Sequence, residues 1–469
     1  MIDFKEYLIN LQNPGKMKNE FTRRRFLTAV SVGSIGAIVA QAIPSFGKPI
    51  STKADKLAIL GGSPVRTKDW PKWPSMIVDD KMLESITNTT KSGIWSRIQS
   101  PSGTVVTFEK EYAKLMGTKY CVGTGSGTQA LATCVEAMGI GPGDEVITSP
   151  YTDFGTISAI LTSRALPVLA DLDRASFQLD PADVAKKINK NTKAIIPVHM
   201  MGMPCDMQSI MALAKKHNLR VIEDACQANF ARYQGKQLGT IGEVGCFSFQ
   251  ASKQISCGEG GAIIGSDEAL MDRCYTVQNH GTDRKGSNVT IGPKYRMNEF
   301  EGAILLGQLP GAKERFNLRN ENAKYLASKL KGFKGLVPQK QYAGTESGGY
   351  YHYAMSYHKE HFKNADRSKF LKAIGAEGVK LSPYIAKGLH GEPWVEHILG
   401  LPEYKEMYTA ARLQQYRQEL KCPNCDAVVN EEMVILSGVN SLLGTKQDMD
   451  DVINAIMKVY DNRDKLAAI

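Results

Sequence analysis

Short apolar runs alternate with longer amphipathic segments through the middle of the chain. Runs with the length of buried strands lie at residues 145–149, 166–171, 194–198 and 219–223. Segments with a helical period follow the first three, at residues 154–162, 181–188 and 207–217. Repeated strand–helix units predict an α/β fold, with a mainly parallel sheet covered by helices on both faces and a ligand site at the carboxyl ends of its strands.

A glycine-rich turn precedes these units. Residues 105–116 have a helical period, residues 120–123 read as a strand, and GTGSGT at 123–128 leads into a helix at 129–138. Free amides at a helix start attract anions, Gly127 permits close approach, and Thr128 adds a hydroxyl. The turn predicts a phosphate site, although many turns of this kind only pack.

An acid ends the apolar run LRVIEDA at residues 219–225. Asp224 is expected at the ligand edge of the sheet, where its carboxylate could keep a ring nitrogen protonated. Gln227 could then donate to a phenolic oxygen. An isolated acid at this place could equally be a solvated strand end.

A lysine lies between two apolar strands in VGCFSFQASKQISCGEGGAIIG, residues 244–265. Burying the ammonium of Lys253 costs free energy unless it is paired or chemically changed, for example in a Schiff base with an aldehyde cofactor. The alternative is a loop lysine whose amine reaches water.

The remaining chain divides into parts of different character. The segment 43–104 is an irregular lead-in, 105–320 a large domain, and 321–469 a smaller α+β domain that closes with an amphipathic helix at 449–460. Residues 1–42 contain Arg23-Arg24 before Phe26-Leu27, a weakly apolar run and a small-residue cleavage site at 40–42. This pattern resembles a twin-arginine signal and predicts export to the periplasm or beyond; an uncleaved membrane anchor is the alternative.

Composition narrows the functional classes. Hydrophobic residues make up 42% and charged residues 23% of the 469-residue chain, which is typical of a globular protein. The net charge is +10, but no Lys/Arg block carries interleaved aromatics, so no nucleic-acid partner is expected. The body after the signal has no apolar run long enough to span a membrane. Among nine cysteines, Cys422 and Cys425 form one C-x-x-C without a second ligand pair, so we expect a structural pair and no metal.

A phosphate turn, a ring-nitrogen carboxylate and a buried lysine, in this order on a parallel sheet, describe a site for pyridoxal 5'-phosphate (PLP). The chain also resembles the DegT/DnrJ/EryC1/StrS aminotransferases, PLP enzymes that aminate keto sugars. The resemblance covers about residue 57 to the C-terminus and is carried by FEKEYAKLMGTKY, GTGSGTQAL, PVHMMGMPCDM, the segment from Glu223 to Gly261, YRMNEFEGAILLGQL and CPNC. It implies the PLP-dependent transferase fold type I, like that of aspartate aminotransferase.

The resemblance assigns roles to seven residues. Lys253 would bind the cofactor covalently and later move the proton, and Asp224 would pair with the pyridine nitrogen. The other five would contact the cofactor: Gln227 at the phenolic oxygen, Phe154 stacked on the ring, and Gly127, Thr128 and Ser248 at the phosphate. Where the family often has asparagine in its G-x-N-x-R segment, this chain has Lys294 in GPKYR. That contact reaches a neighbouring subunit's cofactor in the family, which is normally dimeric, so a homodimer is expected.

The lead-in and the segment AIGAEGVKLSPY resemble the branch that aminates keto cyclitols, often with glutamine. We therefore expect transfer of an amino group from glutamate or glutamine to a keto sugar or keto cyclitol. Tyr384, His390 and Arg296 are candidates for the substrate wall. The alternatives are another PLP reaction on the same fold, such as dehydration or elimination, and a non-catalytic exported binding protein.

Overall fold

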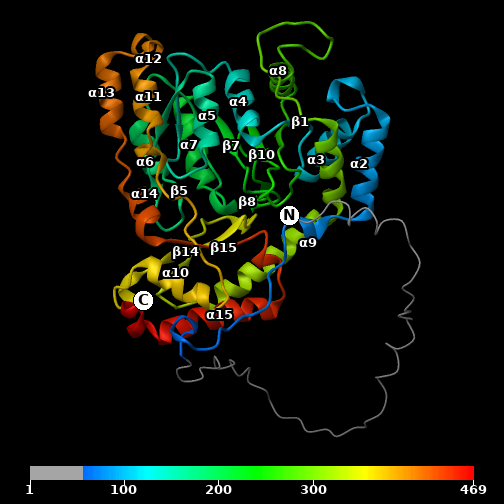
Figure 1. The fold of residues 1–469 in the computed structure, drawn as a ribbon. Coiled ribbons are helices and arrows are strands. Elements are labelled where there is room, and N and C mark those ends of the chain that lie inside the picture. The colour runs from blue at the N-terminus through cyan, green and yellow to red at the C-terminus, as the bar shows by residue number, and fades with distance from the viewer. Residues whose placement is uncertain (1–55) are drawn as a thin grey trace, which may run out of the picture. The chain divides into compact units, whose positions relative to one another are not determined.

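A seven-stranded sheet forms the centre of the computed structural model, which describes residues 56–469; the proposed signal lies outside the described residues (Figure 1). The strand order is β1-β11-β10-β7-β6-β2-β3. In chain order the strands are β1 (Tyr120–Thr124), β2 (Glu145–Thr148), β3 (Leu166–Leu169), β6 (Thr192–Ile196), β7 (Arg220–Asp224), β10 (Val244–Ser248) and β11 (Gly261–Gly265). Every neighbouring pair from β10 to β3 is parallel, and β11 is antiparallel to both of its neighbours. The predicted α/β class is confirmed.

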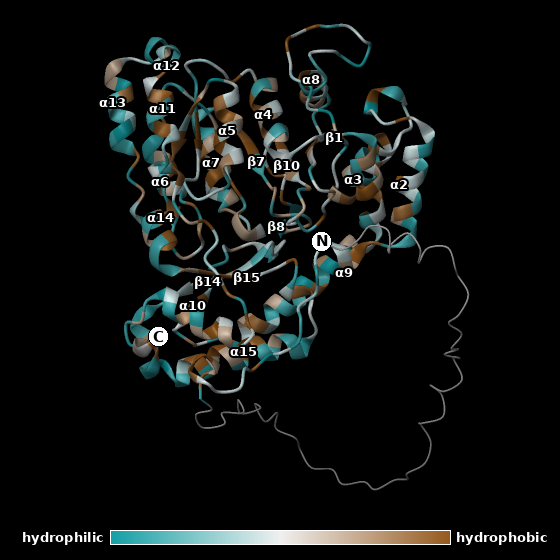
Figure 2. Cartoon of the chain, in the orientation of Figure 1, coloured by the Kyte–Doolittle hydropathy of each residue, from teal (hydrophilic) through white to brown (hydrophobic). Residues whose placement is uncertain are grey.

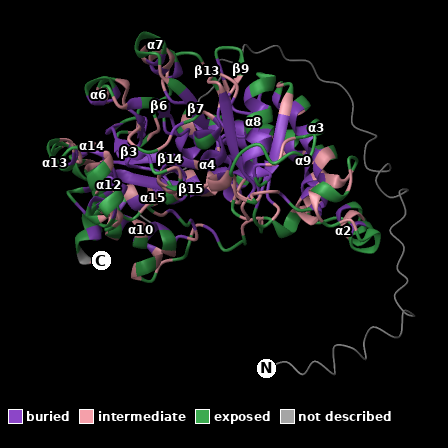
Figure 3. Ribbon diagram, turned by 90° about the horizontal axis from the view of Figure 1, so that it is seen from above, coloured by how far each residue is buried: buried purple, intermediate pink, exposed green. Residues whose placement is uncertain are grey.

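Helices cover both faces of this sheet, whose strands are buried at the centre of the view in Figure 3. They are α3 (Thr104–Met116), α4 (Gly127–Ala137), α5 (Phe154–Thr162), α6 (Pro181–Lys187), α7 (Met207–His217) and α8 (Glu268–Gln278). Most of their buried residues are apolar, and stretches of several of these helices are coloured as hydrophobic in Figure 2. Helix α4 begins two residues earlier than the sequence predicts, because the Ser126 side chain caps it by accepting a hydrogen bond from the Gln129 amide.

Helix α9 (Glu299–Lys329) connects this layer to a second one, and the predicted domain boundary at residue 320 falls inside it. A three-stranded antiparallel sheet with strands β12 (Leu336–Pro338), β14 (His352–Tyr357) and β15 (Met433–Ser437) follows. Helices α10 (Arg367–Ala376) and α15 (Lys446–Asp461) pack with it around a separate apolar core. Helix α15 confirms the predicted closing helix.

The lead-in segment belongs in part to this smaller core. Leu57 is fully buried in it. Arg66 makes ion pairs of 2.6 Å with Asp448 and 2.9 Å with Asp451 on α15. Helix α2 (Asp80–Ser92) packs on α9. The lead-in therefore contributes to the small core although the large-domain sequence, residues 105–320, separates the two.

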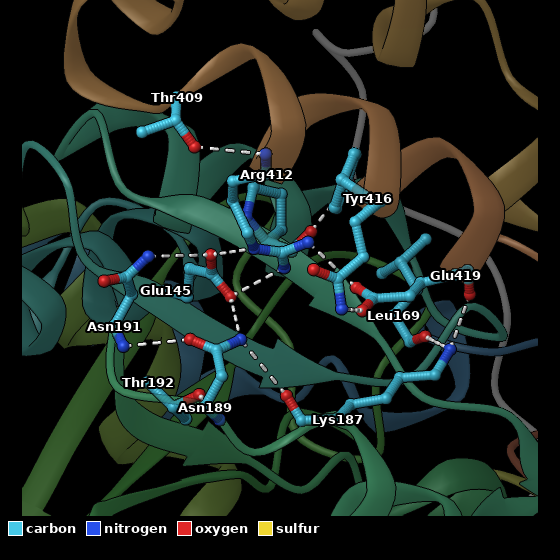
Figure 4. Close-up of polar contacts among 12 residues, drawn as sticks. Glu145, Leu169, Lys187, Asn189, Asn191, Thr192, Thr409, Arg412, Tyr416 and Glu419 are labelled. Atoms are coloured by element: carbon cyan, nitrogen blue, oxygen red, sulfur yellow. Dashed lines mark hydrogen bonds and ion pairs between the residues drawn. The ribbon is translucent and has the colours of Figure 1, made fainter.

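Three helices from the C-terminal part return to the large sheet: α11 (Trp394–Gly400), α12 (Pro402–Met407) and α13 (Ala410–Glu419). Their side chains join the main core. The hydroxyls of Tyr404 and Tyr416 donate to the carbonyls of Ala165 and Pro167, at 3.2 and 2.8 Å, along the edge strand β3. Arg412 forms a two-pronged ion pair with Glu145 at the start of β2, as Figure 4 shows.

The remaining strands and α-helix of the described residues are small. They are helix α14 (Pro423–Ala427), the sheet of β13 (Thr345–Ser347), β8 (Arg232–Tyr233) and β9 (Lys236–Gln237), and the pair β4 (Leu172–Asp173) and β5 (Gln178–Leu179). Within residues 56–469, no helix has the length and apolar character needed to cross a bilayer.

Candidate active site

A cavity of about 390 Å³ lies at the carboxyl ends of β7 and β10, beside the start of α4. Parallel strands place ligands at this edge. Six of the seven predicted site residues line the cavity: Gly127, Thr128, Asp224, Gln227, Ser248 and Lys253. Residues more than 120 positions apart in sequence thus meet in one place.

The first turn of α4 forms one end of the cavity. Gly127 and Thr128 open the helix, so their amides have no partner within it and point outward at its positive end. A Cβ atom at Gly127 would lie 2.8 Å from both Cys226 Sγ and Ser248 Cβ, so only glycine fits here. Together with the hydroxyls of Thr128 and Ser248, these amides suit a phosphate group.

Asp224 is held from two sides. The Thr156 hydroxyl donates to its Oδ2 at 2.8 Å, and the Cys226 amide donates to its Oδ1 at 3.2 Å. The residue is buried at the end of β7. A buried carboxylate fixed in this way can take a charge-assisted hydrogen bond from a protonated ring nitrogen.

Gln227 links the large domain to the small one. Its Oε1 accepts from the Met201 amide at 2.7 Å, and its Nε2 donates to the Tyr384 hydroxyl at 3.1 Å. The amide group has a second N–H that this pairing leaves for a ligand. Burial, with Tyr351 and Asp153 nearby, raises the pKa of Tyr384 well above its ordinary value, so its hydroxyl stays neutral.

Lys253 lies on the turn after β10 and is half-buried. Its Nζ atom lies 4.3 Å from the centre of the Tyr351 ring. No carboxylate in the described part of the chain forms an ion pair with it. Burial first, and then the charge of Lys253, lowers the pKa of His352 to about 3, so the neighbouring imidazole is neutral. An amine without a fixed counter-ion can both accept and release a proton.

The thiol of Cys226 also faces the cavity. Burial, followed by the charge of Asp224, raises the pKa of this thiol well above its ordinary value. A thiol that stays protonated is a poor nucleophile. Lys253 is therefore the better placed of the two nucleophiles.

The seventh predicted residue lies elsewhere. Phe154 is not part of the cavity lining; its ring is half-exposed and lies 6.2 Å from that of Trp394. At this turn Asp153 lines the cavity instead, while its Oδ1 caps α5 by accepting from the Gly155 amide at 2.8 Å. Its neighbours in the lining include Glu259 and Tyr351, which the sequence did not single out. No local pattern marks these residues, because the fold alone brings them to the cavity.

The three candidates for the substrate wall do not all lie at the cavity. Tyr384 lines the cavity, whereas His390 pairs with Asp426 at 3.0 Å, Arg296 donates to Asn279 at 3.0 Å, and neither is part of the lining. Lys294 is exposed.

Cys422 and Cys425 are buried with free thiols. The amides of Asn424 and Cys425 donate to the Asp171 carboxylate, both at 2.9 Å, which ties this segment to the large domain. Among residues 56–469, no three histidine, cysteine or acidic side chains come together as a metal site.

The side chains of the cavity fit PLP, group by group. The amides and hydroxyls at α4 suit its phosphate, the anchored carboxylate of Asp224 its ring nitrogen, the amide of Gln227 its phenolic oxygen and the amine of Lys253 its aldehyde. The space kept free by Gly127 lets the phosphate approach the helix start.

A mainly parallel sheet with this cavity and a smaller C-terminal layer defines the class, fold type I of the PLP-dependent transferases. The chain belongs to the DegT/DnrJ/EryC1/StrS aminotransferase family, whose sequence profile matches residues 77–456.

Relatives and solved structures agree with this assignment. The chain is 32% identical over 415 residues to a putative L-glutamine:3-amino-2,3-dideoxy-scyllo-inosose aminotransferase of Micromonospora echinospora, covering 87% of this chain and 97% of that one. It is 32% identical over 438 residues to the L-glutamine:2-deoxy-scyllo-inosose aminotransferase of Streptomyces kanamyceticus, covering 89% and 99%. The crystal structure of 3-amino-5-hydroxybenzoic acid synthase superposes with a TM-score of 0.72 at 25% identity, covering 87% and 100%. An aminotransferase from Psychrobacter cryohalolentis gives 0.72 at 26% identity, covering 84% and 99%.

Proposed function

We propose that this enzyme transfers the amino group of glutamine or glutamate to the ketone carbon of a cyclitol or sugar. The observation that carries the proposal is the meeting of Lys253, Asp224 and the start of α4 in one cavity. The relatives named above, two L-glutamine:scyllo-inosose-type aminotransferases, support glutamine as donor and a keto cyclitol as acceptor.

The chemistry divides between cofactor and protein. PLP, when bound, supplies an electrophilic carbon and an electron sink. Lys253 acts as the base that takes the α-proton of the donor and as the acid that returns it. Asp224 keeps the ring nitrogen protonated, and its two hydrogen-bond donors keep its carboxylate aimed. Thr128 and Ser248 hold the phosphate, so that the reacting atoms stay beside Lys253.

Charge favours one class of acceptor. The charged residues of the cavity lining are Asp153, Asp224, Glu259 and Lys253. With Asp224 committed to the ring nitrogen and Lys253 to proton transfer, this chain offers the acceptor two carboxylates and no further cation. Such a surface repels a nucleotide diphosphate and accepts a neutral or amino-bearing ring.

Replacement of Lys253 tests the assignment. Lys253→Ala should leave the fold intact and lower amino transfer from glutamine to a keto-inositol by at least about 100-fold, because the general base is lost. Borohydride reduction in the presence of PLP, followed by peptide mass spectrometry, should place the cofactor on Lys253 of the wild type. Lys236→Ala, which removes an exposed lysine on β9, is the matched control. Retained amino transfer by Lys253→Ala, or a label on another lysine, would overturn the proposal.

The proposal also includes the oligomeric state and the location of the enzyme. We propose a homodimer, supported by the family resemblance and by exposed apolar side chains such as Trp95, Val289 and Ile291, the last 89% exposed. Sedimentation velocity should then report a particle of two chains; a single-chain particle at micromolar concentration would contradict it.

We also propose export by the twin-arginine route, supported by Arg23 and Arg24 in residues 1–42.

A further inference from the structure

The free amine of Lys253 has an aromatic partner and no ionic one. In the described part of the chain, its Nζ makes neither a hydrogen bond nor an ion pair, and the centre of the Tyr351 ring lies 4.3 Å away. An ammonium over the face of a tyrosine is attracted by the electron-rich ring. The contact places Tyr351 directly beside the reacting amine.

Tyr351 is held firmly in this position. It is 6% exposed and immediately precedes β14. Its amide donates to Met201 and its carbonyl accepts from Gly438, both at 3.0 Å. Its hydroxyl lies 2.8 Å from Ser252 Oγ, so the residue before Lys253 in sequence is tied to the same ring.

A second tyrosine supports the first from the small-domain side. The rings of Tyr351 and Tyr384 meet edge to face, with centres 6.1 Å apart and planes at 82°. The Tyr384 hydroxyl accepts from Gln227. The His352 ring lies 4.1 Å from that of Tyr351 and is neutral, so it adds no competing cation. Two large-domain side chains thus contact this tyrosine pair of the smaller layer: Ser252 contacts the Tyr351 hydroxyl, and Gln227 donates to the Tyr384 hydroxyl.

We propose that Tyr351 is a positioning residue for Lys253, holding its ammonium at the cavity face by the ring while the hydroxyl keeps that ring in place. The inference rests on the proposed function, because it concerns the lysine assigned there as the acid and base. A carboxylate at this place would bind the ammonium more strongly and hinder release of the proton. An aromatic face keeps the amine in reach without such a counter-ion.

Fluorination of a phenylalanine at position 351 tests the ring contact with little change of shape, and because every member of the series lacks the hydroxyl, only the ring face varies. In the full chain, Tyr351 is replaced by phenylalanine and by 4-fluoro-, 3,4,5-trifluoro- and pentafluorophenylalanine, which weaken the attraction for a cation stepwise. The readout is the rate at which PLP attaches to the apoprotein, followed by absorbance from pH 6 to 10. Attachment needs the unprotonated amine. The titratable groups facing Lys253 are constant across the series: Asp153, Asp224, Cys226, Glu259, His352 and Tyr384.

The expected result is a pH midpoint for attachment that falls with each added fluorine, by about 0.3 to 1 unit in total, because the ring stabilises the ammonium less. The turnover number should fall in the same order, with the KM for glutamine changed by less than about threefold, because positioning of the lysine is lost and donor binding is not. Tyr351→Leu should resemble the pentafluoro variant. Should it fail to fold, judged by thermal unfolding of the apoprotein, the fluorinated series still decides.

A midpoint that stays constant across the series would overturn the inference, and so would an unchanged turnover number in a folded Tyr351→Leu variant. Failure of the proposed function is distinguishable. In that case borohydride reduction of the wild type leaves no cofactor on Lys253, whatever residue stands at position 351.

Discussion

Gly127 has no room for a side chain, and this determines how closely a phosphate can approach α4. Gly127→Ala should place a methyl group 2.8 Å from Cys226 Sγ and Ser248 Cβ. The helix start must then shift, which costs about 1 to 3 kcal/mol of unfolding free energy and weakens PLP binding at least about tenfold. Fluorescence titration of the apoprotein with PLP measures the binding change.

Gly375 in α10 provides the matched control. A Cβ there meets nothing within 4 Å. Gly375→Ala should therefore leave PLP binding unchanged and stabilise the chain by roughly 0.5 to 1 kcal/mol. If Gly127→Ala bound PLP as tightly as the wild type does, the assignment of the start of α4 as the phosphate site would be contradicted.

At the scale of single residues, the sequence identified candidate site residues where the chemistry of the site requires a particular residue type. Lys253 could be singled out because burying an ammonium between two apolar strands costs free energy, and Asp224 because it ends an apolar strand at the ligand edge of the sheet. Phe154 and Asp153 are neighbours at one turn, and the sequence could not tell which of them faces the cavity. In the structure Asp153 lines the cavity and caps α5, while the Phe154 ring lies 6.2 Å from that of Trp394.

At the scale of elements, one buried ion pair holds α13 to the central sheet. Arg412 Nε and Nη2 donate to the two carboxylate oxygens of Glu145, at 2.6 and 2.8 Å, and the Glu145 side chain is fully buried (Figure 4). Arg412→Met leaves this carboxylate without its cation, so unfolding free energy should fall by about 3 kcal/mol in urea titrations. Activity per folded molecule should not change, because Glu145 begins β2 at the end opposite the cavity.

Arg417 on the same helix is the control. Its pair with Glu396 is largely exposed on both sides, so Arg417→Met should have little measurable effect on stability. The double variant Glu145→Gln with Arg412→Met should recover part of the loss. Equal effects of the two arginine substitutions would show that burial of the pair does not matter.

The parallel strands and their helices could be predicted because their period and length are local properties. The antiparallel direction of β11 could not, since it depends on the turn that carries Lys253. The packing of helices α11, α12 and α13 against the large sheet could not be predicted either, because an apolar helix face does not reveal which of the two cores it joins.

At the scale of the whole molecule, export is the proposal that depends on residues outside the described part. A fusion of residues 1–46 to a folded fluorescent reporter should reach the periplasm of a Gram-negative host, because the twin-arginine route carries folded proteins. Replacing Arg23 and Arg24 together by lysine should retain the reporter in the cytosol. Arg25→Lys is the control and should leave export intact. Periplasmic reporter in both variants would contradict the route.

The two-layer architecture followed from sequence only in outline. The large and small parts were expected, but Leu57 and Arg66 show that the lead-in helps to build the small core, a long-range pairing that no local pattern contains.

The edge strand β3 has a consequence for synthesis on the ribosome. The Tyr416 hydroxyl donates to the Pro167 carbonyl within the strand, and the Tyr404 hydroxyl donates to the Ala165 carbonyl just before it; Pro167 and Tyr416 are 249 residues apart. At roughly 5 to 20 residues per second, the nascent chain displays this bare edge for roughly 12 to 50 seconds before its cover emerges. An unpaired strand edge recruits other chains. Holdase chaperones that bind extended segments can therefore bind β3 only during this interval, which ends when α13 leaves the exit tunnel.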